Sequence, residues 1–282
     1  MHDHIKKYTE KLLRDRTAVP ESIRFYRLDD VVTTNRHDEW LPVFTEVFKG
    51  LNVTALLFAK LTLPFADLLI ERVDSSAERL VPNDSETKVF LHDIPFIRER
   101  DWEGKPKPEL AEMIIRCLKE RKAVIIQNLG VVATGGVTVE QAYIGFSTIF
   151  HTTFVKYLLD LLTEGCRIPA ERRHLDTFRD EWFNNPDLSR LTFAPGPITD
   201  QNAIITEICR VGRYTVEQGY VDSFFGNISY FDGKTIFISQ TTSSLDELEG
   251  HIDPVPLDGS STAGLSASSE LPAHRGIYVS SN

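Results

Sequence analysis

The stretch Ala123-Val124-Ile125-Ile126 constrains the fold more than any other part of the chain. It is apolar without polar alternation, which predicts a strand buried on both faces in the middle of a sheet. Gly130 turns the chain into a second apolar strand. Thr138 and Gln141 then fit a capping box at the start of a long helix, which should end near Gly165. This succession predicts an α/β fold.

Further periodic segments extend this pattern along the chain. Strands are expected over 24–33, 53–58 and 89–96, helices over 40–48, 109–120 and 200–219, and a hairpin over 225–231 and 235–240. The segment 167–198 is punctuated by prolines and predicts a linker with one short helix around 175–183. It separates a first lobe, residues 1–166, from a second segment, residues 199–282.

Composition narrows the class of protein and of partner. The chain has 282 residues, of which 41% are hydrophobic and 26% charged, as in an ordinary globular protein. Its formal net charge of −10 argues against a nucleic-acid partner, which would require a basic face. The longest apolar run contains Lys60, Pro64 and Asp67, which a membrane span would not tolerate. Three scattered cysteines indicate a reducing compartment, so a cytoplasmic protein without membrane attachment is expected.

Three polar turns in the second segment carry the strongest functional signal. They are Gly226-Asn227-Ile228-Ser229, Thr241-Thr242 and Ser268-Ser269-Glu270, followed by His274 and Tyr278. In this order and spacing they resemble the class II aldolase/adducin family over residues 199–279. The resemblance implies a three-layer α/β/α fold with a central mixed, largely antiparallel sheet.

The same resemblance implies roles for individual residues. Glu270, partly buried, would be the catalytic proton-transfer residue. The phosphate or carboxylate of a small sugar phosphate or hydroxy/keto acid would be held by Gly226, Asn227, Ser229, Thr241, Thr242, Ser268 and Ser269. Thr242 departs from the family, which usually has glycine there, and a β-branched residue resists close approach of a ligand to the backbone. Family members often self-associate, so a homo-oligomer is a further expected partner.

The first lobe resembles the back half of the same fold. Its strands match those that carry the three zinc-binding histidines of the family, but the corresponding positions hold Phe58, Lys60 and Leu129. A phenyl ring and an isobutyl group donate nothing to a metal, and an ammonium group repels it. Glu39 falls by spacing on the family's glutamate, although His37 and Asp38 do not match its serines. The first lobe is therefore expected to be degenerate and to bind no metal.

The second segment has the front-half elements only, and the chain ends before the family's next zinc-binding histidines. We therefore expect a truncated second domain, with zinc as the cofactor of an intact family domain and none bound by this chain. The parent activity implied is that of a zinc-dependent lyase, performing aldol cleavage or decarboxylation, with this chain inactive alone. The alternatives are a non-catalytic, adducin-like binding or assembly module, a permuted single domain built from both segments, and a disordered remnant.

Overall fold

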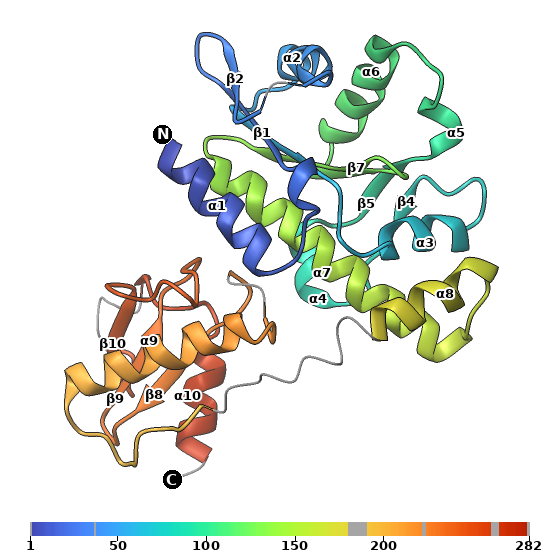
Figure 1. Cartoon of the computed structure of the whole chain (residues 1–282). Coiled ribbons are helices and arrows are strands. Elements are labelled where there is room, and N and C mark those ends of the chain that lie inside the picture. Colours follow the sequence, from blue (N-terminus) through green and yellow to red (C-terminus); the bar gives the residue numbers. More distant parts are fainter. Residues whose placement is uncertain (1, 37, 180–190, 222–223, 261–264, 281–282) are drawn as a thin grey trace. The chain divides into compact units, whose positions relative to one another are not determined.

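The computed structural model describes residues 2–36, 38–179, 191–221, 224–260 and 265–280 (Figure 1). The chain forms two compact units, Met1–Asn185 and Pro186–Asn282. We call them the N-terminal and the C-terminal unit. The division between them falls inside the segment 167–198. Each unit has a sheet of its own.

A seven-stranded sheet forms the centre of the N-terminal unit. Its strands are β1 (Arg24–Leu28), β2 (Val32–Thr34), β3 (Ala55–Ala59), β4 (Arg79–Leu80), β5 (Ile94–Ile97), β6 (Ala123–Ile126) and β7 (Gly130–Gly135). Their order is β2-β1-β3-β7-β6-β5-β4. Only the β5–β6 pair is parallel among these strands. The prediction of an α/β fold with a mixed, largely antiparallel sheet is confirmed.

Helices cover both faces of this sheet (Figure 1). On one face α2 (Leu41–Gly50) and α6 (Lys107–Leu118) bury apolar side chains against Phe58, Val124 and Val132. On the other face lie α7 (Val139–Glu164) and α1 (His2–Arg14). Every residue of β3 and of β6 is buried, as strands covered on both faces require.

The long helix α7 begins and ends where the sequence predicts. The hydroxyl of Thr138 accepts a hydrogen bond from the Gln141 backbone N–H, and the Gln141 side chain accepts from the Thr138 N–H. This capping box satisfies backbone donors that a helix start leaves unpaired. Gly165 follows the last residue with φ of 69°, a conformation that glycine adopts without steric cost. The predicted helix, its cap and its stop are confirmed.

Several features of the N-terminal unit differ from the prediction. The expected single strand over 24–33 is divided into β1 and β2, which pair antiparallel with Tyr26 opposite Thr34. The expected strand over 89–96 is half wrong, because α4 (Ser85–Phe90) precedes β5, with the Asp84 side chain accepting from the Thr87 N–H. His92, inside the segment expected as a strand, is exposed and has φ of 69°. The helix α1 was not predicted, because its apolar face is short and lies within a polar terminus.

The remaining short elements pack around α7 or link strands. They are the 3₁₀ turn η1 (Pro20–Ser22), α3 (Phe65–Arg72), α5 (Glu99–Trp102) and α8 (Pro169–Phe178). The segment expected as linker thus begins with a helix that packs on the N-terminal unit. The Phe178 ring lies 5.2 Å from that of Phe65, and Glu171 of α8 is fully buried beside Arg72.

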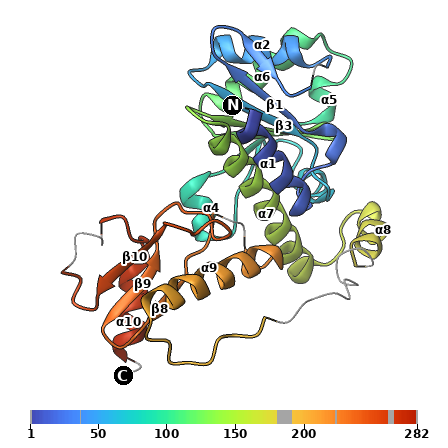
Figure 2. The same cartoon turned by 60° about the vertical axis from the view of Figure 1, so that its left-hand side comes forward.

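The C-terminal unit consists of a three-stranded antiparallel sheet between two helices (Figure 2). The strands β8 (Ser229–Phe231), β9 (Thr235–Ser239) and β10 (Ile252–Pro256) lie in the order β10-β9-β8. Along β9, Phe237 faces α9 (Gln201–Glu217), whereas Ile236 and Ile238 face α10 (Leu271–Ser280). The helix expected over 200–219 is present as α9, and the Asp200 side chain caps it by accepting from the Ala203 N–H at 2.8 Å. The helix α10 was not predicted.

In the part of the chain that is described, no helix combines the length and the hydrophobicity needed to cross a bilayer.

Candidate functional site

The three polar turns of the C-terminal unit meet at the end of β9. Ser239 joins them: its N–H donates to the carbonyl of Ile228 at 3.0 Å, and its carbonyl accepts from the N–H of Ser268 at 2.9 Å. Its buried hydroxyl also accepts from the Ile228 N–H at 3.2 Å. The next residue but one, Thr241, donates from its N–H to Ser266. Folding therefore brings together the segments that the sequence placed far apart.

A chain of side-chain hydrogen bonds crosses this cluster. The Ser229 hydroxyl lies 2.8 Å from the Tyr278 hydroxyl and 2.7 Å from Nδ1 of His274. Nε2 of His274 contacts the amide oxygen of Asn227. The amide oxygen can only accept, so Nε2 must carry the imidazole proton. Tyr278 then donates to Ser229, Ser229 to His274, and His274 to Asn227.

The helix α10 positions both ends of this chain. His274 and Tyr278 are four residues apart, so they lie on the same face of the helix. The Tyr278 ring packs 5.1 Å from that of Phe231 on β8, which fixes the helix against the sheet. Burial lowers the pKa of His274, and the nearby Glu270 only partly offsets this. The imidazole is therefore neutral at pH 7.

Donors for an anion remain at the start of β8. The backbone N–H groups of Gly226 and Asn227 donate to no described residue, and neither does the amide nitrogen of Asn227. Gly226 is required for packing: a Cβ there would lie 2.7 Å from Cδ1 of Leu245. Its backbone does not have positive φ. The glycine thus allows Leu245 to approach closely. The backbone N–H groups of Gly226 and Asn227 have no backbone acceptor among the described residues.

The second turn, Thr241-Thr242, offers fewer donors to an anion than the sequence suggested. The Thr241 hydroxyl donates to the carbonyl of Ala267 at 3.0 Å. Thr242 is exposed and has φ of 64°, in the left-handed region. This conformation costs a non-glycine residue about 1–2 kcal/mol. The backbone at Thr242 thus keeps a conformation suited to glycine, which is the residue that the resemblance leads one to expect there.

The third turn separates buried from exposed residues. Ser268 is buried, and its hydroxyl accepts from the Glu270 N–H at 3.2 Å at the start of α10. Ser269 and Glu270 are exposed, and the Glu270 carboxylate accepts no hydrogen bond from a described residue. The expected partial burial of Glu270 is therefore wrong for this structure, because Glu270 immediately precedes α10 and is exposed to solvent.

Sequence reasoning missed residues that hold the cluster together. Asp253 is buried on β10 and accepts from the Gln240 side chain at 2.8 Å and from the Ser266 hydroxyl at 2.6 Å. Ser239 was read only as a strand residue. No local pattern marks either of them, because their partners lie on other segments. His274 and Tyr278 were noted by their spacing from Glu270, but not as parts of one hydrogen-bonded chain.

In the N-terminal unit, the positions that correspond to zinc ligands belong to the apolar core. Phe58 is 5% exposed, and its ring centroid lies 5.2 Å from that of Phe44 and 5.9 Å from that of Trp40. Leu129 packs partly buried against the same cluster, and Lys60 is exposed. These side chains do not fit a zinc ion. Among the described residues of the whole chain, no three His, Cys, Asp or Glu side chains gather as metal ligands.

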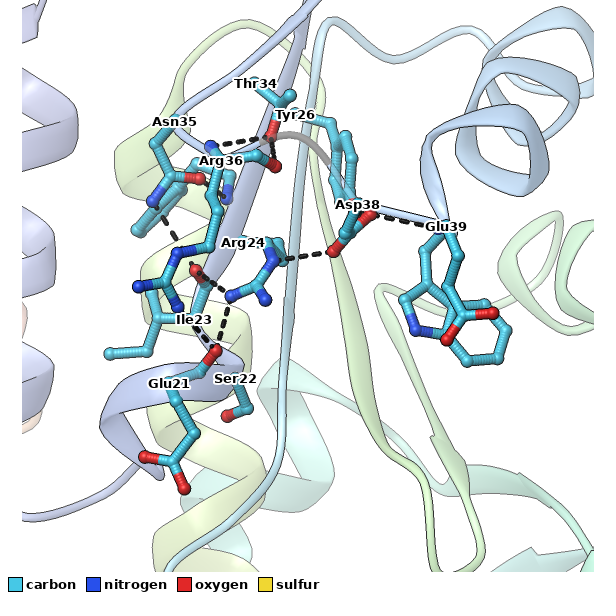
Figure 3. A network of polar contacts seen from close by, with 12 residues as sticks. Glu21, Ser22, Ile23, Arg24, Tyr26, Thr34, Asn35, Arg36, Asp38 and Glu39 are labelled. Atoms are coloured by element: carbon cyan, nitrogen blue, oxygen red, sulfur yellow. Dashed lines mark hydrogen bonds and ion pairs between the residues drawn. The ribbon is translucent and has the colours of Figure 1, made fainter.

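The neighbourhood of Glu39 is a structural network (Figure 3). Asp38 accepts from Nε of Arg24 at 2.6 Å, from the Tyr26 hydroxyl at 3.1 Å and from the Trp40 N–H at 2.9 Å. The Glu39 carboxylate points away from these residues and binds Nζ of Lys107 at 2.9 Å. His37 lies outside the described residues. The carboxylate of Glu39 is thus occupied by an ion pair at the surface.

Comparison with protein-family models gives a match to the C-terminal part of the chain. A model of the class II aldolase and adducin N-terminal domain matches residues 206–282. No curated protein matches the chain.

Similar solved structures include L-fuculose-1-phosphate aldolase from Thermus thermophilus, which is 16% identical over 58% of this chain and 97% of its own, with a TM-score of 0.49. YgbL from Escherichia coli, a putative aldolase/epimerase/decarboxylase by its description, is 9% identical over 56% and 88%, with a TM-score of 0.45. At these identities and TM-scores, neither protein says what this chain binds or converts.

Proposed function

We propose that the C-terminal unit, whose residues 206–282 match the model of the class II aldolase and adducin N-terminal domain, binds a small phosphorylated or carboxylated compound at Asn227, Ser229 and His274. The observation that carries this proposal is the hydrogen-bonded chain from Tyr278 to Asn227. It gathers hydroxyl, amide and imidazole donors on one side of the sheet, next to N–H groups that no described residue uses.

An incoming anion would take over these donors. Hydroxyl groups rotate freely, so Ser229 and Tyr278 can turn their protons toward a phosphate or carboxylate oxygen. A nearby anion also favours the charged imidazole of His274, which becomes a donor at both nitrogens. Ser268, Ser269, Thr241 and Thr242 stay proposed contacts for the remaining oxygens or for the rest of the ligand.

For an intact domain of this family, we further propose a catalytic role for Glu270. There Glu270 would move a proton on and off carbon in an aldol cleavage or a decarboxylation. It lies one helical turn before His274, whose N–H donates to the Glu270 carbonyl at 3.1 Å. Phe58, Lys60 and Leu129 supply no zinc ligands in the N-terminal unit. For this chain alone we therefore propose ligand binding without turnover.

Sulfate is the appropriate first probe, because its charge is constant between pH 5 and 8, whereas that of phosphate changes. We expect calorimetry on the full chain to detect saturable sulfate binding that Asn227→Asp weakens by about tenfold or more, or ~1.4 kcal/mol, because it adds a negative charge at the site. Glu249→Gln is the matched control, since Glu249 forms an exposed ion pair with Arg213 in the same unit. Equal affinity in wild type and Asn227→Asp would contradict the proposal.

The pH dependence tests the role of His274 separately. Burial lowers its pKa in the free protein, and a bound anion raises it, so binding takes up a proton. Sulfate affinity should therefore increase as the pH falls from 8 toward 5, and His274→Gln should remove this dependence. Affinity that is independent of pH in the wild type would show that the imidazole does not contact the anion.

A further inference from the structure

A cavity of about 400 Å³ opens in the N-terminal unit between α3, α8 and the turn that joins β6 to β7. Its size is within the range of small-molecule sites, which is roughly 300–1,000 Å³. The floor is apolar and includes the buried residues Leu63, Ile126 and Phe178. Polar groups stand at the wall and the rim. This combination is typical of a site that binds an organic molecule with one apolar and one polar side.

Asp67 is the polar group inside the wall. Its Oδ1 accepts from the Asn128 N–H at 2.9 Å, whereas Oδ2 accepts no hydrogen bond from a described residue. Glu71 follows one helical turn later on α3 and reaches the rim on the same side. The charged groups of Lys60 and Glu71 form no ion pair with a described residue, although both line the cavity.

Local backbone geometry builds this wall. Asn128 has φ of 62°, and Gly130 has φ of 150°. A Cβ on Gly130 would lie 2.6 Å from the carbonyl oxygen of Ala59, so only glycine lets the turn approach the end of β3. The turn thereby directs the Asn128 N–H at Asp67 and leaves the cavity open beside it. A non-glycine residue in the left-handed region is uncommon, and such residues concentrate at functional sites.

The charged side chains that line the cavity determine which ligand groups it can bind. Burial raises the pKa of Asp67; the Asn128 hydrogen bond and Lys60 oppose this, while Glu71 and Glu99 reinforce it. A desolvated carboxylate among other carboxylates is stabilised by a cationic partner. Lys60 also lines the cavity and offers the reverse charge for an anionic group.

We propose that this cavity binds a small zwitterion with an apolar body, of the class of a free α-amino acid with an apolar side chain. The ammonium group binds Oδ2 of Asp67 and the carboxylate of Glu71. The carboxylate of the ligand faces Lys60. The apolar side chain lies on the floor at Leu63 and Phe178. The cavity lies in the N-terminal unit, whereas the proposed anion site lies in the C-terminal unit.

Three probes that share the isobutyl side chain of leucine separate the two charged ends. L-leucine carries both charges, isoamylamine only the ammonium group, and 4-methylpentanoate only the carboxylate. Calorimetry or ligand-observed NMR on the full chain should show saturable binding of L-leucine. Each single-charge probe should bind at least about tenfold more weakly than L-leucine. This corresponds to a loss of ~1.4 kcal/mol of binding free energy for each lost charge contact.

Two variants locate the site. Asp67→Asn keeps an oxygen for the Asn128 N–H but removes the charge, and should weaken L-leucine binding by about tenfold. Lys60→Gln alters an exposed side chain, so folding is not at risk, and should weaken L-leucine without affecting isoamylamine. Lys119→Gln, another exposed lysine, is the control and should bind as the wild type does.

Three results would overturn the proposal. The first is the absence of saturation by L-leucine up to about 20 mM, because binding would then be weaker than a specific small-molecule site requires. The second is binding that neither Asp67→Asn nor Lys60→Gln changes, because the ligand would then lie elsewhere. Equal binding of isoamylamine and L-leucine would likewise overturn the role of Lys60 and with it the zwitterion.

Discussion

Asp93 ties three segments of the N-terminal unit together through one carboxylate. It accepts from Arg121 at 2.6 and 2.8 Å and from Arg79 at 3.0 Å, and it contacts Nδ1 of His92 at 3.1 Å. Burial alone would raise the pKa of Asp93, but the hydrogen bonds from Arg121, His92 and Arg79 outweigh it and lower the pKa to about 2. The pairing was not predictable, because its members come from separate turns.

The lowered pKa predicts a loss of stability in acid. The carboxyl of an unfolded chain titrates near 3.9, so the contribution of Asp93 is complete above that pH and is lost as the pH falls through about 2. Between pH 5 and 2 the wild type should lose about 2 kcal/mol of unfolding free energy more than Asp93→Asn does. Urea unfolding at both pH values measures this. Parallel losses in the two proteins would show that Asp93 does not carry the effect.

At the scale of elements, α8 is held to the N-terminal unit by a buried ion pair. Nε of Arg72 lies 3.2 Å from Oε1 of Glu171, with 3% and 0% of the two side chains exposed. The other oxygen of Glu171 accepts from the N–H groups of Arg167 and Ile168 at the start of α8. The Tyr157 ring of α7 covers the Arg72 guanidinium. The pair therefore joins α3, α7 and α8.

Removing the charge of Glu171 should be costly. Glu171→Gln leaves the Arg72 guanidinium buried without a counter-ion, and we expect a loss of about 3–5 kcal/mol of unfolding free energy, measured by urea denaturation of the full chain. Glu164→Gln is the control, because Glu164 pairs with Arg167 at the exposed surface. Its loss should stay below about 1 kcal/mol. Similar effects of both variants would mean that the buried pair does not hold α8.

Elements with a complete local signal could be predicted, and those that depend on distant partners could not. The helix α7 has its cap at Thr138, its apolar periodicity and its stop at Gly165 in one continuous stretch. In α10, Pro272 and Gly276 weaken the local signal, and the helix is stabilised by packing on β9 instead. The same holds for the candidate site: its motif residues were recognisable, but the contacts of His274 with Asn227 and Ser229 arise only when α10 folds onto the sheet.

At the scale of the whole molecule, the two units should separate under limited proteolysis. Phe193, near the start of the C-terminal unit, is 66% exposed and suits chymotrypsin. Cleavage there should leave two resistant fragments, since each unit has its own sheet and its own apolar core. Mass spectrometry of the digest measures this. Rapid breakdown of the C-terminal fragment to small peptides would instead support the disordered remnant that the sequence left open.

The order of strands in the larger sheet predicts which pairing forms late in folding. β3 pairs with β7 through Ala55 and Gly135, about 80 residues apart, and this pair alone joins the β2-β1-β3 side to the β7-β6-β5-β4 side. Such non-local pairing forms slowly, because the entropy cost of closing the intervening loop comes before any stabilising contact between the strands is made. During synthesis one edge of β3 stays unpaired until β7 has left the ribosome. We expect the nascent chain to be most prone to aggregation in this interval, so slower growth of the expression host at low temperature should increase the yield of soluble protein.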